Sequence, residues 1–168
     1  MTISMFSASV PRLANALTNL AHLLSLAQTH VETHKINPDA ILNYRLFPDM
    51  LDFKRQVQIA CDTCKGVVAR LAGVEGPVFE DKEQSFAELQ ERIAKTIAYI
   101  EGFSAAQIDG TEDKDIVVTR GEKQTHYKGM QFLLGHALPN VYFHSSVAYS
   151  ILRHNGVAVG KRDYLGKP

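Results

Sequence analysis

The chain lacks several features that commonly announce a function. It has no tryptophan, only two cysteines and no excess of either charge, because 18 Lys and Arg balance 18 Asp and Glu. A neutral chain has no general attraction to nucleic acid or to an anionic membrane, so neither is expected as a partner. No apolar run approaches the roughly 20 residues that cross a bilayer, and the first residues lack the pattern of a signal peptide. A cytoplasmic location is therefore expected.

The two cysteines, Cys61 and Cys64, have the C-x-x-C spacing of a redox dithiol or of half a zinc site. The sequence has no second cysteine pair to complete a zinc site, and the residues before Cys61 are typical of a helix. The spacing therefore predicts two semi-buried helix residues in a reducing compartment. Nucleotide-binding loops, nucleophile elbows and H-E-x-x-H motifs are also missing from the sequence.

The chain length predicts one domain, spanning 1–168, that buries about 70% of the surface exposed by its unfolded chain. Long segments have apolar residues at steps of three and four, the spacing of amphipathic helices. They are predicted to run from near Ser9 to His34, from Pro48 to Gly73, from Ser85 to Gly102 and from Gly129 to Asn155.

The connections between these helices carry shorter signals. Asn37 and Pro38 predict the start of a short helix, while 74–83 has the glycine, proline and acidic residues of a loop. The runs that flank the RGE tripeptide between Asp115 and Lys128 predict a β-hairpin. The sequence therefore predicts an all-α fold, a four-helix bundle with a small β-hairpin before the last helix.

The last helix places polar residues in an apolar setting. His136, Asn140 and His144 recur at four-residue steps, and each step turns an ideal helix by about 400°. Buried imidazoles need hydrogen-bond partners or a metal. These polar residues are therefore expected to face the bundle interior opposite the second long helix. The stripe that they follow also contains Phe143, Val147 and Ile151.

His136 and His144 are candidate metal ligands, with zinc, nickel and manganese as candidate ions. They lie about 12 Å apart on an ideal helix, so one ion needs the kink expected at Pro139 or a ligand from another helix. Gln58 and Asp62 in the second long helix are the candidates for that further oxygen. The open alternative is a hydrogen-bonded polar core without a metal.

Two further segments contain polar residues that need partners. Arg45 precedes the second long helix in an otherwise apolar segment, and its fixed charge is expected to meet Asp49 or Asp62 near the candidate pocket. The C-terminal GKRDYLG is expected to be a solvated tail that docks through Tyr164 and Leu165.

The sequence also carries a family resemblance. The pieces concerned are LFPDM, RQVQIACDTCKG, FAELQERIAKTIAYI and HALPNVYFHSSVAYSILRHNGVAVGKRDYLG. From Met1 to Gly166 the chain resembles a bacterial family of unknown function in the DinB/YfiT-like superfamily of metal-dependent four-helix-bundle proteins. The resemblance implies a homodimer, because such proteins commonly pair. Catalytic relatives are thiol-dependent transferases and isomerases.

The resemblance also implies where a metal would bind. Superfamily relatives hold a divalent metal with one histidine of the second helix and two of the last, the second of these standing eight residues before an LR dipeptide. His144 matches that second histidine, because LR stands at 152–153. The first falls on Asn140, and the second-helix position falls near Gln58 or Asp62.

Two classes of function remain open from the sequence. One is a protein with a divalent-metal or small-molecule site, acting as a metal-assisted hydrolase or thiol-dependent transferase if it is an enzyme. The other is a non-enzymatic, dimeric binding or stress-related protein whose polar core only fixes the fold.

Overall fold

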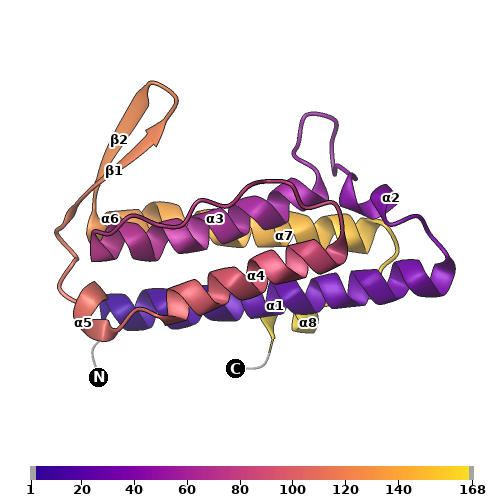
Figure 1. Cartoon of the computed structure of the whole chain (residues 1–168), viewed down its shortest axis with the longest axis horizontal. Helices are drawn as coiled ribbons and strands as arrows, with labels where there is room; N and C mark the ends of the chain where they lie inside the picture. The colour runs from indigo at the N-terminus through magenta and orange to yellow at the C-terminus, as the bar shows by residue number, and fades with distance from the viewer. Residues whose placement is uncertain (1–2, 167–168) are drawn as a thin grey trace.

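The computed structural model describes residues 3–166 (Figure 1). Within them the chain forms a helical bundle, with a two-stranded antiparallel hairpin just before the last long helix. This confirms the predicted fold class. The elements are α1 (Met5–His34), α2 (Asp39–Leu42), α3 (Phe53–Ala72), α4 (Phe86–Glu101), α5 (Ala105–Ile108), β1 (Asp115–Arg120), β2 (Lys123–Lys128), α6 (Gly129–Phe132), the π-helical turn η1 (Leu133–Ala137), α7 (Leu138–His154) and α8 (Lys161–Leu165).

The bundle consists of α1, α3, α4 and α7, and α3 packs against both α4 and α7 (Figure 1). Helices α3 and α4 run in the same direction, because the connection between them returns along the length of the bundle. We call this connection, residues 74–85, the crossover segment. Helix α4 is antiparallel to α1 (Figure 1), and the two are joined by a bond from Gln90 Nε2 to the Ala21 carbonyl at 2.8 Å. The short α8 packs on α1.

Helix α1 begins at Met5, four residues before the predicted start at Ser9. Ser4 and Ser7 form a capping box, in which each hydroxyl accepts a hydrogen bond from the backbone of the other residue. These bonds satisfy free N–H groups of the first turn, so the helix starts earlier. Pro11 consequently lies in the second turn and not in the first. The predicted end of this helix is confirmed.

Helix α3, in contrast, begins later than predicted, at Phe53 and not at Pro48. Asp52 is its N-cap and accepts a hydrogen bond from the Arg55 backbone at 2.9 Å. Its predicted end is confirmed, since Gly73 has a φ of 76°, the left-handed conformation that glycine adopts easily. Helix α4 begins as predicted, directly after its N-cap Ser85.

The core joins buried apolar side chains of all the long helices in one cluster. Cys61 and Cys64 belong to it, and both are fully buried and unbridged, which corrects the prediction that they are semi-buried. Burial raises the pKa of the Cys61 thiol to about 12. A thiol with such a pKa is protonated at neutral pH and is a poor nucleophile, so the C-x-x-C spacing reflects packing.

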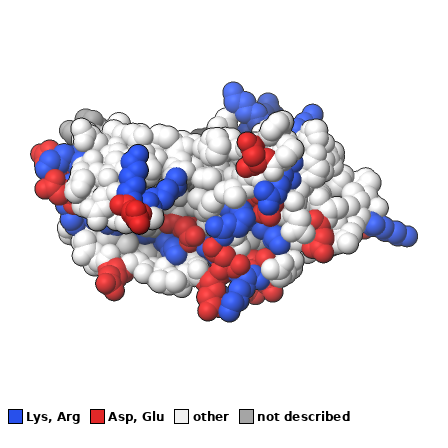
Figure 2. All heavy atoms as spheres, turned by 90° about the horizontal axis from the view of Figure 1, so that it is seen from above, with Lys and Arg blue, Asp and Glu red and all other residues white. Residues whose placement is uncertain are grey.

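The surface shows no large area of one charge in the view of Figure 2. Positive and negative side chains are intermixed there, with wide uncharged areas between them. Among the described residues, the longest helices do not combine enough length with enough apolar character to cross a bilayer.

The last long helix is helical from Gly129 to His154 and is not broken at Pro139. Its irregularity is η1, where the Leu138 N–H bonds to the Leu133 carbonyl five residues earlier. Pro139 has no N–H to donate to the backbone hydrogen bonds of the helix. In the wider turn before it, the backbone bond spans five residues in place of four. The kink expected at Pro139 stays a prediction, and the irregular turn that the structure shows lies directly before it. An extra residue in one turn also offsets the two flanking stretches by about 100°.

Candidate functional site

Helix α7 places His144 against α3. The ring Nδ1 lies 2.7 Å from Oε1 of Gln56, and the two residues are 8% and 2% exposed. The amide nitrogen of Gln56 donates to the Leu51 carbonyl at 3.0 Å, which leaves the amide oxygen facing the ring. That oxygen can only accept, so the hydrogen-bond network assigns the ring proton to Nδ1. The lone pair of the neutral imidazole is then on Nε2.

The imidazole of His144 is neutral at physiological pH. Burial, helped by the positive charge of Arg120, holds its pKa below the usual value. The described residues supply no hydrogen bond to Nε2, and this atom is not one of the buried polar atoms that lack a partner. Nε2 is therefore not completely sealed from solvent, although the residue is only 8% exposed. The arrangement is a basic nitrogen with a fixed direction, held by a second residue.

His136 faces the hairpin. It lies in η1, half-buried, with Nδ1 3.4 Å from the Tyr127 hydroxyl of β2 and its ring stacked on Phe132. Burial, together with Arg120 and Arg70, lowers its pKa. The π turn explains this direction, because it removes His136 from the stripe that an uninterrupted α-helix would share with His144.

The stripe predicted for the last helix is only partly correct. His144 is buried against α3, as expected, and Asn140 is half-buried one turn before it on the same helix. Phe143, in contrast, is 55% exposed and does not point into the core. Its ring meets the His144 ring edge-on.

The oxygens that we expected from α3 lie on a different side of that helix. Gln58 donates to Glu83 at 2.8 Å and Asp62 accepts from Arg92 at 2.8 Å, both toward α4 and the crossover segment. The structure therefore does not bring Gln58 or Asp62 together with His144. The residue that does meet His144 is Gln56, which the sequence reasoning missed.

The signal for Gln56 was present in the sequence. Gln56 is three residues after Phe53 and four before Ala60, so it lies on the buried stripe of α3. A polar residue on an apolar stripe indicates a buried partner, for Gln56 as for His144. Gln58 and Asp62 lie roughly 100° or more from that stripe's centre.

Arg45 forms a hydrogen bond to the backbone of the loop before α3. Its Nη1 donates to the Met50 carbonyl at 2.9 Å, and among the described residues it has no carboxylate partner. The predicted ion pair with Asp49 or Asp62 was therefore wrong. A backbone carbonyl at the surface is sufficient for an exposed guanidinium, because water satisfies its other donors.

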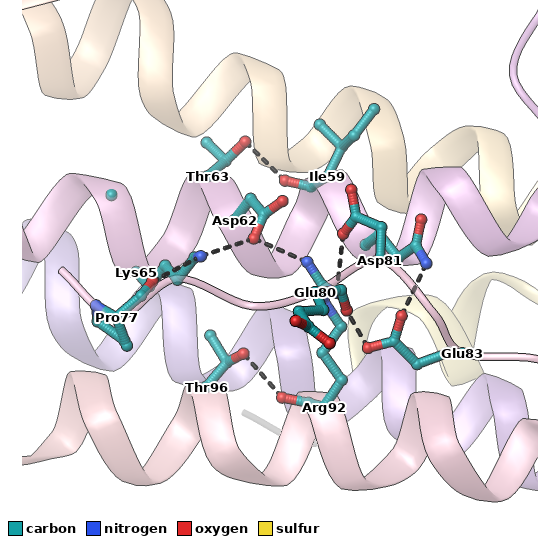
Figure 3. Close-up of polar contacts among 12 residues, drawn as sticks. Ile59, Asp62, Thr63, Lys65, Pro77, Glu80, Asp81, Glu83, Arg92 and Thr96 are labelled. Carbon is teal, nitrogen blue, oxygen red and sulfur yellow. Dashed lines mark hydrogen bonds and ion pairs between the residues drawn. The ribbon is translucent and has the colours of Figure 1, made fainter.

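A charge network around the buried Arg92 joins α3, α4 and the crossover segment (Figure 3). The Arg92 side chain is 2% exposed, and its guanidinium lies 2.8 Å from Asp62, 3.0 Å from Asp81 and 3.0 Å from Glu83. Burial by itself raises the pKa of Asp81 and of Glu83, but hydrogen bonds from arginines outweigh it and hold both below their usual values. The network fixes the crossover segment over the groove between two parallel helices.

The donors around His144 do not fit a resident divalent metal. In residues 3–166 no three His, Cys, Asp or Glu side chains are grouped so that they could hold an ion. The groups beside His144 on α3 and α7 are the amides of Gln56 and Asn140, which are weak ligands for zinc or nickel. The chemistry available at this position is therefore that of the imidazole.

Comparison with known proteins identifies the family. A family model described as a domain of unknown function (DUF1993) matches residues 5–165. A solved structure, described as a DinB family member protein from Shewanella denitrificans, shares 42% sequence identity with a TM-score of 0.89, covering 97% of this chain and 92% of that one. A search of curated proteins finds no match. The resemblance predicted from the sequence is confirmed, and the chain belongs to the DUF1993 family as a DinB-like helical-bundle protein.

Proposed function

We propose that this DinB-like protein binds a small polar molecule at Nε2 of His144, between α3 and α7. The observation that carries the proposal is the fixed tautomer of this histidine, set by Gln56 and, behind it, the Leu51 carbonyl. A neutral imidazole held in this way accepts a hydrogen bond from a hydroxyl, amine or thiol. Asn140, one turn away on α7, offers an amide that can donate or accept.

The same geometry supports a catalytic role for a thiol or for water. A neutral imidazole with a free Nε2 can take the proton of a bound thiol, and the resulting thiolate is the nucleophile that a thiol-dependent transferase requires. With water as the partner, the proton transfer is the one that a hydrolase needs. In either case His144 is the base and Gln56 is the residue that orients it.

The competing function is a non-enzymatic binding protein in which His144 and Gln56 only stabilise the core. The closed hydrogen bond between them favours this alternative, because a satisfied buried pair fixes packing without any ligand. The two proposals differ in what reaches Nε2. A core pair is insensitive to added molecules, whereas a binding site responds to them.

Nuclear magnetic resonance of the histidine rings tests the proposal. Wild-type protein is titrated with glutathione, with cysteine and with a fragment library of small hydroxyl and amine donors. We expect the Nε2 signal of His144 to shift, while the signal of His154, exposed at the end of α7, stays unchanged. We expect Gln56→Leu, which frees the ring, to weaken the response. If no probe shifts His144, its role is structural.

A matched pair of variants supports that measurement. His144→Gln removes the basic nitrogen but keeps a polar side chain, and His154→Gln makes the same change at an exposed site on the same helix. Binding seen by any method should disappear in the first variant and persist in the second. Equal binding by both would exclude His144 from the site.

A further inference from the structure

A cavity of about 420 Å³ lies between α1, α7 and α8. Helix α1 contributes the apolar side chains of Ala16, Leu20 and Leu23 to its lining, together with the amides of Asn15 and Asn19. The volume falls within the roughly 300–1,000 Å³ of small-molecule sites, which are typically apolar with a few polar groups. We call this space the α8 cavity. The side chains that α7 contributes to it do not include His144.

One buried polar group in the lining of the α8 cavity has no partner among the described residues. Ser145 of α7 is 4% exposed, and its hydroxyl forms no hydrogen bond within residues 3–166. Helical serines commonly bond the carbonyl four residues earlier, as Ser150 does to Ser146 at 2.8 Å. Ser145 does not, so its hydroxyl is a buried polar atom without a partner in the wall of the α8 cavity.

The mouth of the α8 cavity carries a free positive charge. Arg12 of α1 is exposed and has no ion pair within the described part of the chain. It lies near Tyr142 of α7, since burial raises the pKa of this tyrosine while Arg12 acts in the opposite direction. The planar guanidinium matches a carboxylate with two parallel hydrogen bonds.

Helix α8 closes the cavity from outside. The Ser146 hydroxyl donates to the Tyr164 hydroxyl at 3.0 Å, and His22 lies 3.2 Å from Asp163. These contacts tie α8 to both α7 and α1. Tyr164, which also lines the cavity, is therefore fixed as part of its wall. The tail that we expected to dock through Tyr164 and Leu165 is a helix that packs through Tyr164, whereas Leu165 is 53% exposed.

We infer that the α8 cavity binds a monocarboxylic acid with an apolar body. The apolar part of the lining takes the hydrocarbon part, Arg12 binds the carboxylate at the mouth, and Ser145 accepts or donates one hydrogen bond inside. This site is separate from the one at His144 and does not depend on it. The groove beside the crossover segment is a weaker candidate, because its buried cation, Arg92, already has carboxylate partners.

Calorimetric titration with three probes of equal length tests the inference. Octanoate carries the carboxylate, octanol is uncharged and octylamine is positive. We expect octanoate to bind most tightly. Arg12→Gln should lower the affinity for octanoate by about tenfold, which corresponds to the loss of one hydrogen bond to a charged group. The same variant should leave the affinity for octanol unchanged. The control Arg153→Gln, at an exposed position of α7, should leave all three probes unchanged.

A second variant tests the place of binding. Ala16→Phe fills part of the cavity and should abolish binding of octanoate and octanol together, with helix content checked by circular dichroism. If Ala16→Phe does not fold, Ser145→Ala replaces it, and we expect this variant to weaken octanoate. Failure of octanoate to bind, equal binding of octanoate and octylamine, or equal effects of Arg12→Gln and Arg153→Gln would overturn the inference.

Discussion

Replacing Arg92 by methionine is expected to lower the free energy of unfolding. Methionine keeps most of the volume and the apolar stem but removes the charge that Asp62, Asp81 and Glu83 share. Lys65 still pairs with Asp62 at 2.9 Å, and Arg55 still pairs with Asp81. Among residues 3–166, Glu83 is then the carboxylate of this network left without a cation.

The magnitude follows from how exposed each partner is. Removing one partner of a fully buried pair costs about 3–5 kcal/mol, whereas exposed pairs contribute about 0–1 kcal/mol. The side chains of Asp62 and Asp81 are 37% and 38% exposed, so solvent screens them, but that of Glu83 is 13% exposed. The free energy of unfolding should therefore fall by about 2–3 kcal/mol.

Urea unfolding followed by far-ultraviolet circular dichroism measures this loss, since the chain has no tryptophan. A double-mutant cycle with Glu83→Gln gives the sharper result. In the wild type that change should destabilise, because it breaks an ion pair, and beside Arg92→Met it should stabilise, because it removes an unpaired carboxylate. Lys95→Met, at an exposed position of α4, is the control. A loss below about 1 kcal/mol for Arg92→Met, or the same sign in both backgrounds, would refute the reasoning.

The remaining predictions concern the other buried polar groups and the surface of α7. His144→Ala should cost about 2–4 kcal/mol, because it leaves a cavity and an unpaired Gln56 oxygen; an unchanged melting temperature would argue against that burial. Untagged protein incubated with zinc, nickel and manganese should retain far less than one ion per chain, and stoichiometric metal that His144→Ala abolishes would restore the metal site expected from the sequence. Cys61 and Cys64 should react with a thiol reagent only after denaturation, because burial holds both pKa values far above neutral pH; reaction of the native protein would contradict this. The chain should form a homodimer in light scattering, and Phe143→Lys, at a 55% exposed position of α7, should shift it to monomer if that face is the interface.

The charge network around Arg92 should stabilise the fold less as the pH falls. The pKa values of Asp81 and Glu83 are lower in the fold than their ordinary values of 3.8 and 4.5. Their contribution is therefore complete above those values and is lost as the pH falls through the lower, folded ones. Arg92→Met should remove most of this acid dependence. An equally steep loss in the variant would show that other carboxylates cause it.

The helices could be predicted because each buries one regular stripe, and stripes are visible in a sequence. The ends were less certain, since they depend on side-chain caps that compete with each other. Pro11 suggested a first turn near Ser9, but the capping box of Ser4 and Ser7 extends α1 by another turn. The parallel course of α3 and α4 was not predictable from periodicity, which carries no direction.

The site was harder to predict because it depends on irregular geometry. Reading His136 and His144 as one stripe assumed an ideal α-helix, and the π turn before Pro139 breaks that assumption. Arg92 was overlooked because a charged residue beside Ile93 indicates a solvated face, yet Arg92 is buried under the crossover segment. A loop that folds over a helix changes which face of the helix is buried. The periodicity of apolar residues in the helix does not predict this burial.

His144 and Ser145 are neighbours in the sequence but serve different surfaces of α7. Successive residues of a helix differ by about 100°, so one side chain meets Gln56 of α3 and the other meets the cavity beside α1 and α8. Two ligands should therefore bind independently. Saturating octanoate should shift the backbone amide of Ser145 while leaving the Nε2 signal of His144 and its response to thiols unchanged. Equal shifts of both groups, or loss of the thiol response, would show a single coupled site in place of two.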